Sequence, residues 1–392
     1  MFDFFTGEDF GFLGNCKKCG LPRNPIDRVI GDGGKGILIV MGSPEPEQVS
    51  LKSFRAGTYD RVNKLLVGAG IDPTRDCWVT GSVLCPISGS KAKSHYVSHC
   101  RENIRNFIKW KKPSVILLFG IEAVAGVVPW ESQLGTIYRW RGYQIPDRDY
   151  GAWLCPTYAP DYVEEKNWSK AVIGRFETEV LEALKCVGKP LPECKESVEI
   201  LHDEDEVCRR LSSIKEPFAF DYETTGLKPH RKGHRIVSCG ISETPDTAYA
   251  FMMTDKVSES LKVLLTSDVG KYVANLQFES IWTQATLKCK VNNWMWDTML
   301  AAKIMDNRVE IAEKGAGITG VKFQAYVNFG VRGYEEEMKK YFEADGNNDF
   351  NKIEDCPVDA LLKYNALDAL YEHKLALKQM ETIKLANIEE VA

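Results

Sequence analysis

Two acidic residues, two positions apart, stand at the end of a short apolar run. The run is Phe218-Ala-Phe220, and Asp221 and Glu223 follow it before Thr224-Thr225-Gly226. An apolar run ended by turn residues predicts a buried strand, whose period of two puts both acids on one face. Neighbouring carboxylates repel each other unless a cation lies between them, and oxygen ligands suit Mg²⁺ or Mn²⁺. The motif indicates either a metal site or a strand end with two solvated acids.

Two further motifs follow Asp221 and Glu223 along the chain. Residues 361–373 have a helical pattern, in which Tyr364 and Asp368 are four positions apart and therefore share one face. Between the two acidic motifs, a predicted strand from Tyr272 runs into a helix start at Asn275-Leu-Gln-Phe278-Glu279. If the fold brings the acids together, they can hold divalent cations.

The three motifs, taken in this order, resemble the proofreading exonuclease family. More narrowly, they resemble the tyrosine-bearing branch found in bacterial and phage family A DNA polymerases, over about residues 198 to 385. The resemblance implies a ribonuclease H-like fold and hydrolysis of the terminal phosphodiester at a DNA 3′ end, which releases 5′-mononucleotides. Such sites use two divalent ions, here Mg²⁺ or Mn²⁺.

The same resemblance assigns roles to individual residues. It implies that the two ions are held by Asp221, Glu223 and Asp368, and that the Tyr364 hydroxyl orients the attacking water. Glu279 occupies a position where the family usually has aspartate, so its longer side chain is expected to bind directly or through a water. The remaining expected contacts are with DNA and involve Asn275 and Phe278.

The first half of the chain carries cysteines with metal-ligand spacing. Cys16 and Cys19 form a Cys-x-x-Cys pair followed by a glycine, and Cys85 and Cys100 come from a later segment. Four thiolates from two segments fit either a zinc site or an iron–sulfur cluster. Redox chemistry and a plain structural role are the alternatives.

Apolar strand patterns alternate with helical patterns in this half, which predicts an α/β/α layer with a mostly parallel sheet. Residues 12–185 resemble the family 4 uracil-DNA glycosylases, on the cysteine spacing, Phe54, the lysine-proline-strand-glycine run after residue 111 and Pro156-Thr-Tyr-x-Pro160. The resemblance implies a 4Fe–4S cluster on Cys16, Cys19, Cys85 and Cys100, with zinc as the alternative, and makes Phe54 the base-stacking ring.

Three departures from the glycosylase pattern weaken the expectation of base excision. Ser43 stands where the family has a water-activating acid, unless Glu45 or Glu47 replaces it. Gly81 stands in place of an asparagine that binds the uracil edge, and Ala159 in place of a charge-stabilising histidine. Because losing one such donor costs ~10²–10³ in rate, we expect an inactive glycosylase-like domain that binds DNA or a partner.

Composition and charge are those of an ordinary globular chain, with 44% hydrophobic and 27% charged residues among 392. Residues 1–190 carry 25 Lys and Arg against 21 Asp and Glu, and the rest carries 25 against 34, so the first half is the more plausible nucleic-acid surface. The start lacks a signal-peptide pattern, and the apolar stretch 115–130 is too interrupted to span a bilayer. These features predict no membrane association and a cytoplasmic location, which is the host cytoplasm if the chain is phage-encoded.

We therefore predict an α/β protein with three parts: a glycosylase-like domain (1–187), a linker (188–197) and a ribonuclease H-like exonuclease domain (198–392). Residues 306–357 are expected to form a surface excursion that touches substrate or a partner. The expected partners are single-stranded or frayed DNA 3′ ends and a separate DNA polymerase chain. Two other interpretations stay open: a bifunctional repair enzyme with an active glycosylase, and a non-enzymatic replisome adaptor.

Overall fold

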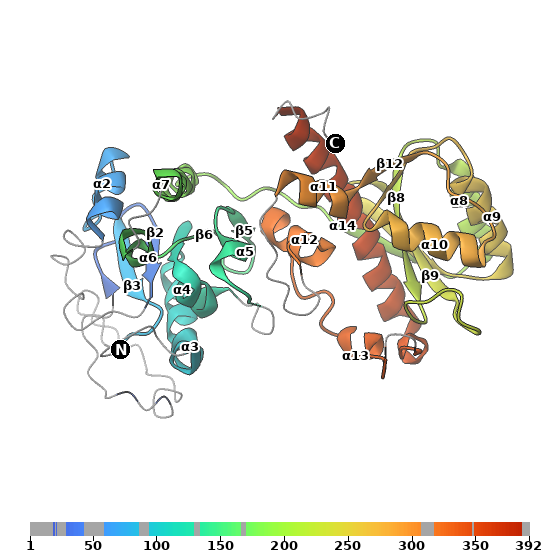
Figure 1. Cartoon of the computed structure of the whole chain (residues 1–392), viewed down its shortest axis with the longest axis horizontal. Coiled ribbons are helices and arrows are strands. Elements are labelled where there is room, and N and C mark those ends of the chain that lie inside the picture. The colour runs from blue at the N-terminus through green and yellow to red at the C-terminus, as the bar shows by residue number, and fades with distance from the viewer. Residues whose placement is uncertain are drawn as a thin grey trace. The chain divides into compact units, whose positions relative to one another are not determined.

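The chain divides into two compact units, each with its own six-stranded sheet (Figure 1). The first unit comprises residues 1–192, 310–314 and 327–330, and the second comprises 193–309, 315–326 and 331–392. A computed structural model describes residues 19, 21, 29–42, 59–85, 94–128, 134–165, 170–306, 317–346 and 349–385.

The sheet of the first unit has a parallel centre and two antiparallel edges. Its order is β1-β3-β2-β4-β6-β5, in which β3, β2, β4 and β6 are parallel neighbours. The two innermost strands, β2 and β4, are apolar along their whole length because a parallel sheet is covered on both faces. The strands are β1 (Val29–Ile30), β2 (Ile37–Met41), β3 (Cys77–Gly81), β4 (Val115–Phe119), β5 (Ile145–Asp147) and β6 (Ala152–Thr157).

Helices cover this sheet as the alternating pattern predicted. The helices are α2 (Asp60–Gly68), α3 (Ser94–Lys111), α4 (Gly120–Val127), α5 (Ile137–Trp140), α6 (Pro160–Glu165) and α7 (Lys170–Leu184). The apolar faces of α2 and α7 share one core with alternate residues of β2 and β4. A second helix pair, α3 and α4, packs together, and α4 also contacts β2 and β6. The predicted α/β layer with a mostly parallel sheet is confirmed, but no finding confirms that it is glycosylase-like.

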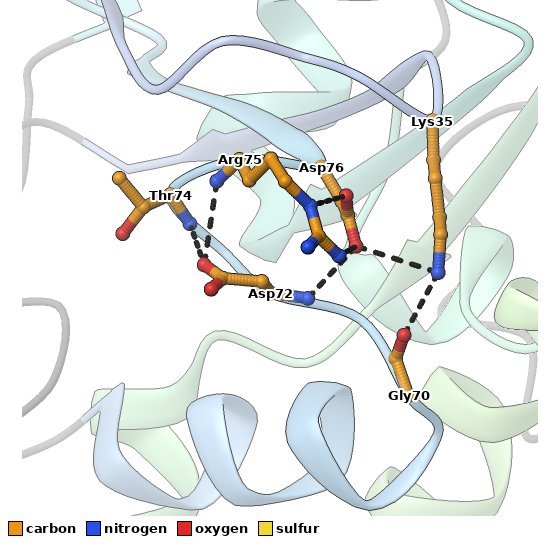
Figure 2. A network of polar contacts seen from close by, with 6 residues as sticks. All are labelled: Lys35, Gly70, Asp72, Thr74, Arg75 and Asp76. Atoms are coloured by element: carbon orange, nitrogen blue, oxygen red, sulfur yellow. Dashed lines mark hydrogen bonds and ion pairs between the residues drawn. The ribbon is translucent and has the colours of Figure 1, made fainter.

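A polar network fixes the turn that leads into β3 (Figure 2). The Asp76 carboxylate accepts hydrogen bonds from Arg75 Nε at 2.8 Å and from the Asp72 backbone N–H at 2.9 Å. Lys35 Nζ lies 3.3 Å from the same carboxylate and donates to the Gly70 carbonyl at 2.8 Å. The hydrogen bond from Arg75 is the main cause that holds the pKa of Asp76 well below its usual range. The network therefore depends on an ionised Asp76.

The sheet of the second unit is mixed, in the order β12-β11-β8-β9-β10-β7. The strand β9 is antiparallel to both of its neighbours, whereas the β8–β11, β11–β12 and β10–β7 pairs are parallel. The strands β9 and β10 form a hairpin. The strands are β7 (Ser197–Leu201), β8 (Phe218–Thr224), β9 (Ile236–Thr244), β10 (Thr247–Met252), β11 (Lys271–Val273) and β12 (Trp294–Asp297).

Helices pack on both faces of the second sheet. The helices that follow β7 along the chain are α8 (Glu204–Ser213), α9 (Asp255–Leu265), α10 (Leu276–Thr286), α11 (Thr298–Met305), α12 (Val321–Phe329), α13 (Lys339–Phe342) and α14 (Val358–Leu385), with a 3-10 turn η4 (Ile353–Asp355). Residues of α8, α9 and α10 share one core with β8 and β9. The long helix α14 buries Leu362, Ala366 and Leu370 against Ala248 and Ala250 of β10. Among the described helices, none combines the length and apolar character that a membrane crossing needs.

The stretch 306–357 differs from the expected surface excursion where the structure describes it. Met338, Ile353 and Cys356 are buried, and they pack with Leu361 and Tyr364 of α14. The apolar side chains scattered among its charges give this stretch a buried face, so it covers the start of α14. The expectation of a mere excursion was wrong for these residues.

Asp297, the last residue of β12, caps the start of α11. Its carboxylate accepts hydrogen bonds from the backbone N–H groups of Met299 at 2.9 Å and Leu300 at 3.1 Å. It also accepts from Asn275 at 3.2 Å and Leu276 at 2.8 Å, at the start of α10. One side chain thus fixes the starts of two helices.

Candidate active site

Three acids far apart in the sequence meet at one place in the second unit. Asp221 and Glu223 come from β8 and Asp368 comes from α14, and each offers a carboxylate oxygen within 4.8 Å of the other two. Among the residues that the structure describes, no other group of three or more His, Cys, Asp or Glu residues meets this criterion. We call these three residues the carboxylate site. Its all-oxygen donor set fits hard divalent cations such as Mg²⁺ or Mn²⁺.

The close packing of α14 on β9 makes this meeting possible. A Cβ atom at Gly240 of β9 would lie 2.3 Å from the Asn365 carbonyl oxygen, so a larger residue there would push α14 away. Asn365 in turn donates from Nδ2 to Asp221 Oδ2 at 2.7 Å, and its Oδ1 accepts from Ser238 Oγ at 2.8 Å. Asn365 thus links α14 to β8 and to β9, about one helical turn before Asp368.

Burial and the repulsion of neighbouring carboxylates disfavour ionisation of Asp221 and Glu223. Burial, followed by the charge of Asp368, raises the pKa of Asp221 to about 8. Burial also raises the pKa of Glu223 well above its ordinary value, with further contributions from Asp221 and Asp368. A divalent cation offsets this repulsion and favours the ionised form of both acids, so cation binding should strengthen as the pH rises.

Tyr364 lies beside the carboxylate site, one helical turn before Asp368. Its side chain is buried, and its ring centroid lies 5.3 Å from that of Phe342 and 5.8 Å from that of Tyr334. Burial is the main cause that raises its pKa well above the ordinary value. The hydroxyl therefore keeps its proton at neutral pH and can donate a hydrogen bond.

Glu279, on α10, lies outside the group of three. It is 2% exposed, and its Oε2 has no hydrogen-bond partner within the described part of the chain. Burial, followed by the charges of Asp221 and Glu223, raises its pKa well above the ordinary value. Glu372 on α14 is similarly buried with an unpartnered Oε2. Glu279 therefore lies near the charges of the carboxylate site but is not one of its three acids.

The predicted DNA contacts Asn275 and Phe278 differ in their exposure to solvent. Asn275 is exposed at the start of α10 and has a left-handed backbone with φ 67°. The Phe278 ring is half-buried, lies 6.1 Å from the Trp282 ring and packs against the core of the second unit. Phe54 lies outside the described residues. All three DNA contacts stay predictions.

The predicted cysteine site lies only partly within the described residues. Cys16 lies outside them, whereas Cys19 and Cys85 are half-buried and Cys100 is buried. Cys100 Sγ accepts a hydrogen bond from the Leu84 backbone N–H at 3.3 Å. The three described thiols do not form a group within 4.8 Å of one another. The cysteine cluster stays a prediction.

Sequence reasoning missed the polar residues that surround the three acids. Asp368 Oδ2 accepts from Lys322 Nζ at 2.5 Å, and Oδ1 accepts from Tyr334 Oη at 2.7 Å. No local pattern marks these two residues. Asn365 did carry a signal, since it precedes Asp368 by three positions on the same helix and therefore faces the same way.

Comparison with protein-family models identifies the unit that carries the carboxylate site. Residues 196–383 match the model described as 3′–5′ exonuclease. These residues therefore carry a 3′–5′ exonuclease domain. The match contains all three acids of the carboxylate site together with Tyr364 and Glu279, and it does not reach the first unit. A comparison with curated proteins found no match.

The chain is similar to several solved structures over about half of its length. NrnC of Brucella melitensis with bound Mg²⁺ is 17% identical, with a TM-score of 0.35, and the match covers 50% of this chain and 85% of that one. The catalytic core of RRP6 from Trypanosoma brucei is 10% identical with a TM-score of 0.37, covering 50% of each chain. The Nibbler EXO domain of Aedes aegypti is 15% identical with a TM-score of 0.34, covering 48% and 90%. These likenesses are too weak to define a substrate for the exonuclease domain.

Proposed function

We propose that the protein is a 3′–5′ DNA exonuclease of the proofreading type, which hydrolyses the terminal phosphodiester and releases 5′-mononucleotides. The single observation that supports this most is the convergence of Asp221, Glu223 and Asp368 within 4.8 Å, inside the residues that match the exonuclease model. A non-enzymatic adaptor would have no need for such a group of acids.

Each residue of the site has a role in this proposal. Asp221, Glu223 and Asp368 would hold two divalent ions, which would lower the pKa of the attacking water and offset the charge on the leaving 3′ oxygen. Tyr364 remains neutral and orients the water through its hydroxyl. Glu279, which lies outside the ligand group, acts through a bridging water. The carboxylates provide the fixed geometry that phosphodiester cleavage requires.

The preference for DNA is supported by the resemblance of the three motifs to family A polymerase exonucleases. On the same ground we propose a frayed or single-stranded 3′ end as substrate and a separate polymerase chain as partner. Because residues 12–185 resemble the glycosylases, we also propose that the first unit binds DNA or a partner and holds a 4Fe–4S cluster. Gly81 and Ala159 lack the polar side chains that base excision uses, which supports an inactive glycosylase.

The test compares single-stranded DNA labelled at its 3′ end with the same strand labelled at its 5′ end, in Mg²⁺. We expect immediate release of labelled mononucleotide from the first and a ladder of shortened strands from the second. Asp221→Ala should abolish both, whereas Glu259→Ala, which removes an exposed acid on α9, should change neither. Wild-type-like degradation by Asp221→Ala would reject the proposal, and faster degradation of an RNA strand would reject the preference for DNA.

A second assay separates the inactive from the active glycosylase interpretation. Uracil-containing duplex is incubated with the protein in chelator, which stops the nuclease, and is then treated with alkali. We expect no cleavage at the uracil. Cleavage there would establish the bifunctional repair enzyme instead.

A further inference from the structure

Asp368 is held by two residues that none of the exonuclease motifs includes. Lys322, in the first turn of α12, contacts Oδ2, and Tyr334, in the loop after α12, contacts Oδ1. Both belong to the second unit, as Asp368 does. Their contacts occupy both oxygens of a carboxylate that also belongs to the carboxylate site.

The Lys322 ammonium group contacts Asp368, and the lysine side chain is partly exposed to solvent. Nζ lies 2.5 Å from Asp368 Oδ2, 4.8 Å from the Tyr364 ring centroid and 5.6 Å from the Tyr334 ring centroid. The rings favour a cation at this place. The Lys322 side chain is 31% exposed, whereas the Asp368 side chain is 4% exposed. The lysine is therefore a partly exposed cation in contact with an otherwise enclosed acid.

A divalent cation cannot join Asp368 without changing this contact. An ion bound by all three acids must approach the Asp368 oxygens, one of which already has an ammonium group at hydrogen-bond distance. Two cations on one carboxylate repel each other. The flexible four-carbon stem of lysine allows the head group to move while its backbone stays in α12, and an ammonium is a good point-charge ligand for phosphate.

We propose that Lys322 is a substrate-binding residue that rests on Asp368 as a counterion and passes to a phosphate oxygen of the nucleic-acid 3′ end when cations bind. In the free protein, Lys322 offsets part of the repulsion among the acids. In the loaded protein, it supplies a positive charge to the phosphodiester. This inference rests on the proposed function, because it assigns the substrate of the same site.

The test uses Lys322→Met, which keeps the apolar stem and removes the charge, Lys322→Arg, which keeps the charge, and Lys303→Met as control. Lys303 is exposed on α11. Mn²⁺ binding without nucleic acid is followed by electron paramagnetic resonance. Affinity for a fluorescent single-stranded oligonucleotide is measured in Ca²⁺. Circular dichroism checks that each variant is folded.

We expect Lys322→Met to bind Mn²⁺ about tenfold more tightly than wild type and the oligonucleotide about tenfold more weakly. Lys322→Arg should retain most of the oligonucleotide affinity, and Lys303→Met should match wild type. Unchanged Mn²⁺ affinity in a folded Lys322→Met protein would overturn the counterion role, and unchanged oligonucleotide affinity would overturn the phosphate role. Neither measurement depends on turnover, so a wild-type protein that binds both ligands but cuts no DNA would refute the proposed function alone.

Discussion

Asp221 has two neighbours with opposite effects on its charge. The Asn365 amide donates to its carboxylate at 2.7 Å and favours the ionised form, whereas Asp368 and burial favour the protonated form. The second effect prevails, since the pKa is raised to about 8. Ionised Asp221, which would bind a cation, therefore lowers the stability of the metal-free folded protein.

This conflict predicts a pH-dependent stability of the protein in chelator. The folded pKa of Asp221 lies above its ordinary value of 3.8, so the native state holds a proton that the unfolded state has released. The free energy of unfolding therefore falls as pH rises from about 4 to about 8. We expect Asp221→Asn to raise the melting temperature by ~2–4 °C at pH 8, for about 1 kcal/mol.

Differential scanning fluorimetry in chelator at pH 5 and pH 8 measures this effect. The gain should shrink at pH 5, where wild-type Asp221 is mostly protonated, and should disappear when Mg²⁺ stabilises the wild type. A gain of equal size at both pH values would show that repulsion at Asp221 is not its cause.

Two contacts between elements position acidic side chains: the close approach of α14 to β9 places Asp368, and the cap that links α10 to α11 fixes the helix that carries Glu279. The first depends on Gly240, which leaves room for the Asn365 carbonyl. The second depends on Asp297, which accepts four backbone hydrogen bonds. Neither residue contacts substrate in our proposal, yet both determine where catalytic side chains lie.

Gly240→Ala should separate α14 from β9. The added methyl would lie 2.3 Å from a backbone oxygen, so we expect a loss of roughly 1–3 kcal/mol in the free energy of unfolding. Nuclease activity should fall as well, because Asp368 moves relative to Asp221. Gly174→Ala, on α7 with no atom within 4 Å of the new methyl, is the control and should be neutral or slightly stabilising. Equal stability of the two variants in urea denaturation would contradict this account.

Asp297→Ala should destabilise the exonuclease domain by about 1–2 kcal/mol, because the backbone N–H groups at two helix starts lose their acceptor. Urea denaturation measures the change. Asp255→Ala provides the comparison, since that exposed acid lies in the first turn of α9, where Thr254 makes the cap. We expect an effect within about 0.5 kcal/mol there. Similar losses in both variants would indicate general helix-end electrostatics instead of a specific cap.

At the scale of the whole molecule, the two units differ in the observations that point to a function. The second unit has a family match and a group of converging acids. The first has a parallel sheet with Gly42, Gly81 and Gly120 directly at or after the carboxyl ends of its central strands, where open α/β sheets bind ligands. Its function in our proposal depends on cysteines, one of which lies outside the described residues.

Metal analysis of the purified protein tests the cysteine site. We expect iron and acid-labile sulfide, which Cys85→Ala and Cys100→Ala should lose, while Cys194→Ala, in the predicted linker 188–197, should keep them. Nuclease activity in Mg²⁺ should survive in all three variants. Stoichiometric zinc without sulfide would replace the cluster by the zinc alternative, and a protein free of both metals would eliminate the site.

The sequence by itself determined the order and type of most elements in both units. Hydrophobic period and turn residues predicted the strand at Phe218, the strand from Tyr272 and the helix carrying Tyr364 and Asp368, because these signals are local. It also singled out the acids that the fold brings together. Local periodicity gives no distance between β8 and α14, which depends on sheet register and on the space at Gly240.

Only the tertiary structure decided which side chains surround those acids. Lys322 reaches Asp368 across 46 positions and Asn365 reaches Asp221 across 144, and no local pattern encodes contacts over such separations. The structure likewise shows that Glu279, although part of a recognised motif, is not one of the three acids of the carboxylate site. The reason is physical: a strand or helix fixes which way a side chain points, but packing between elements fixes what it meets.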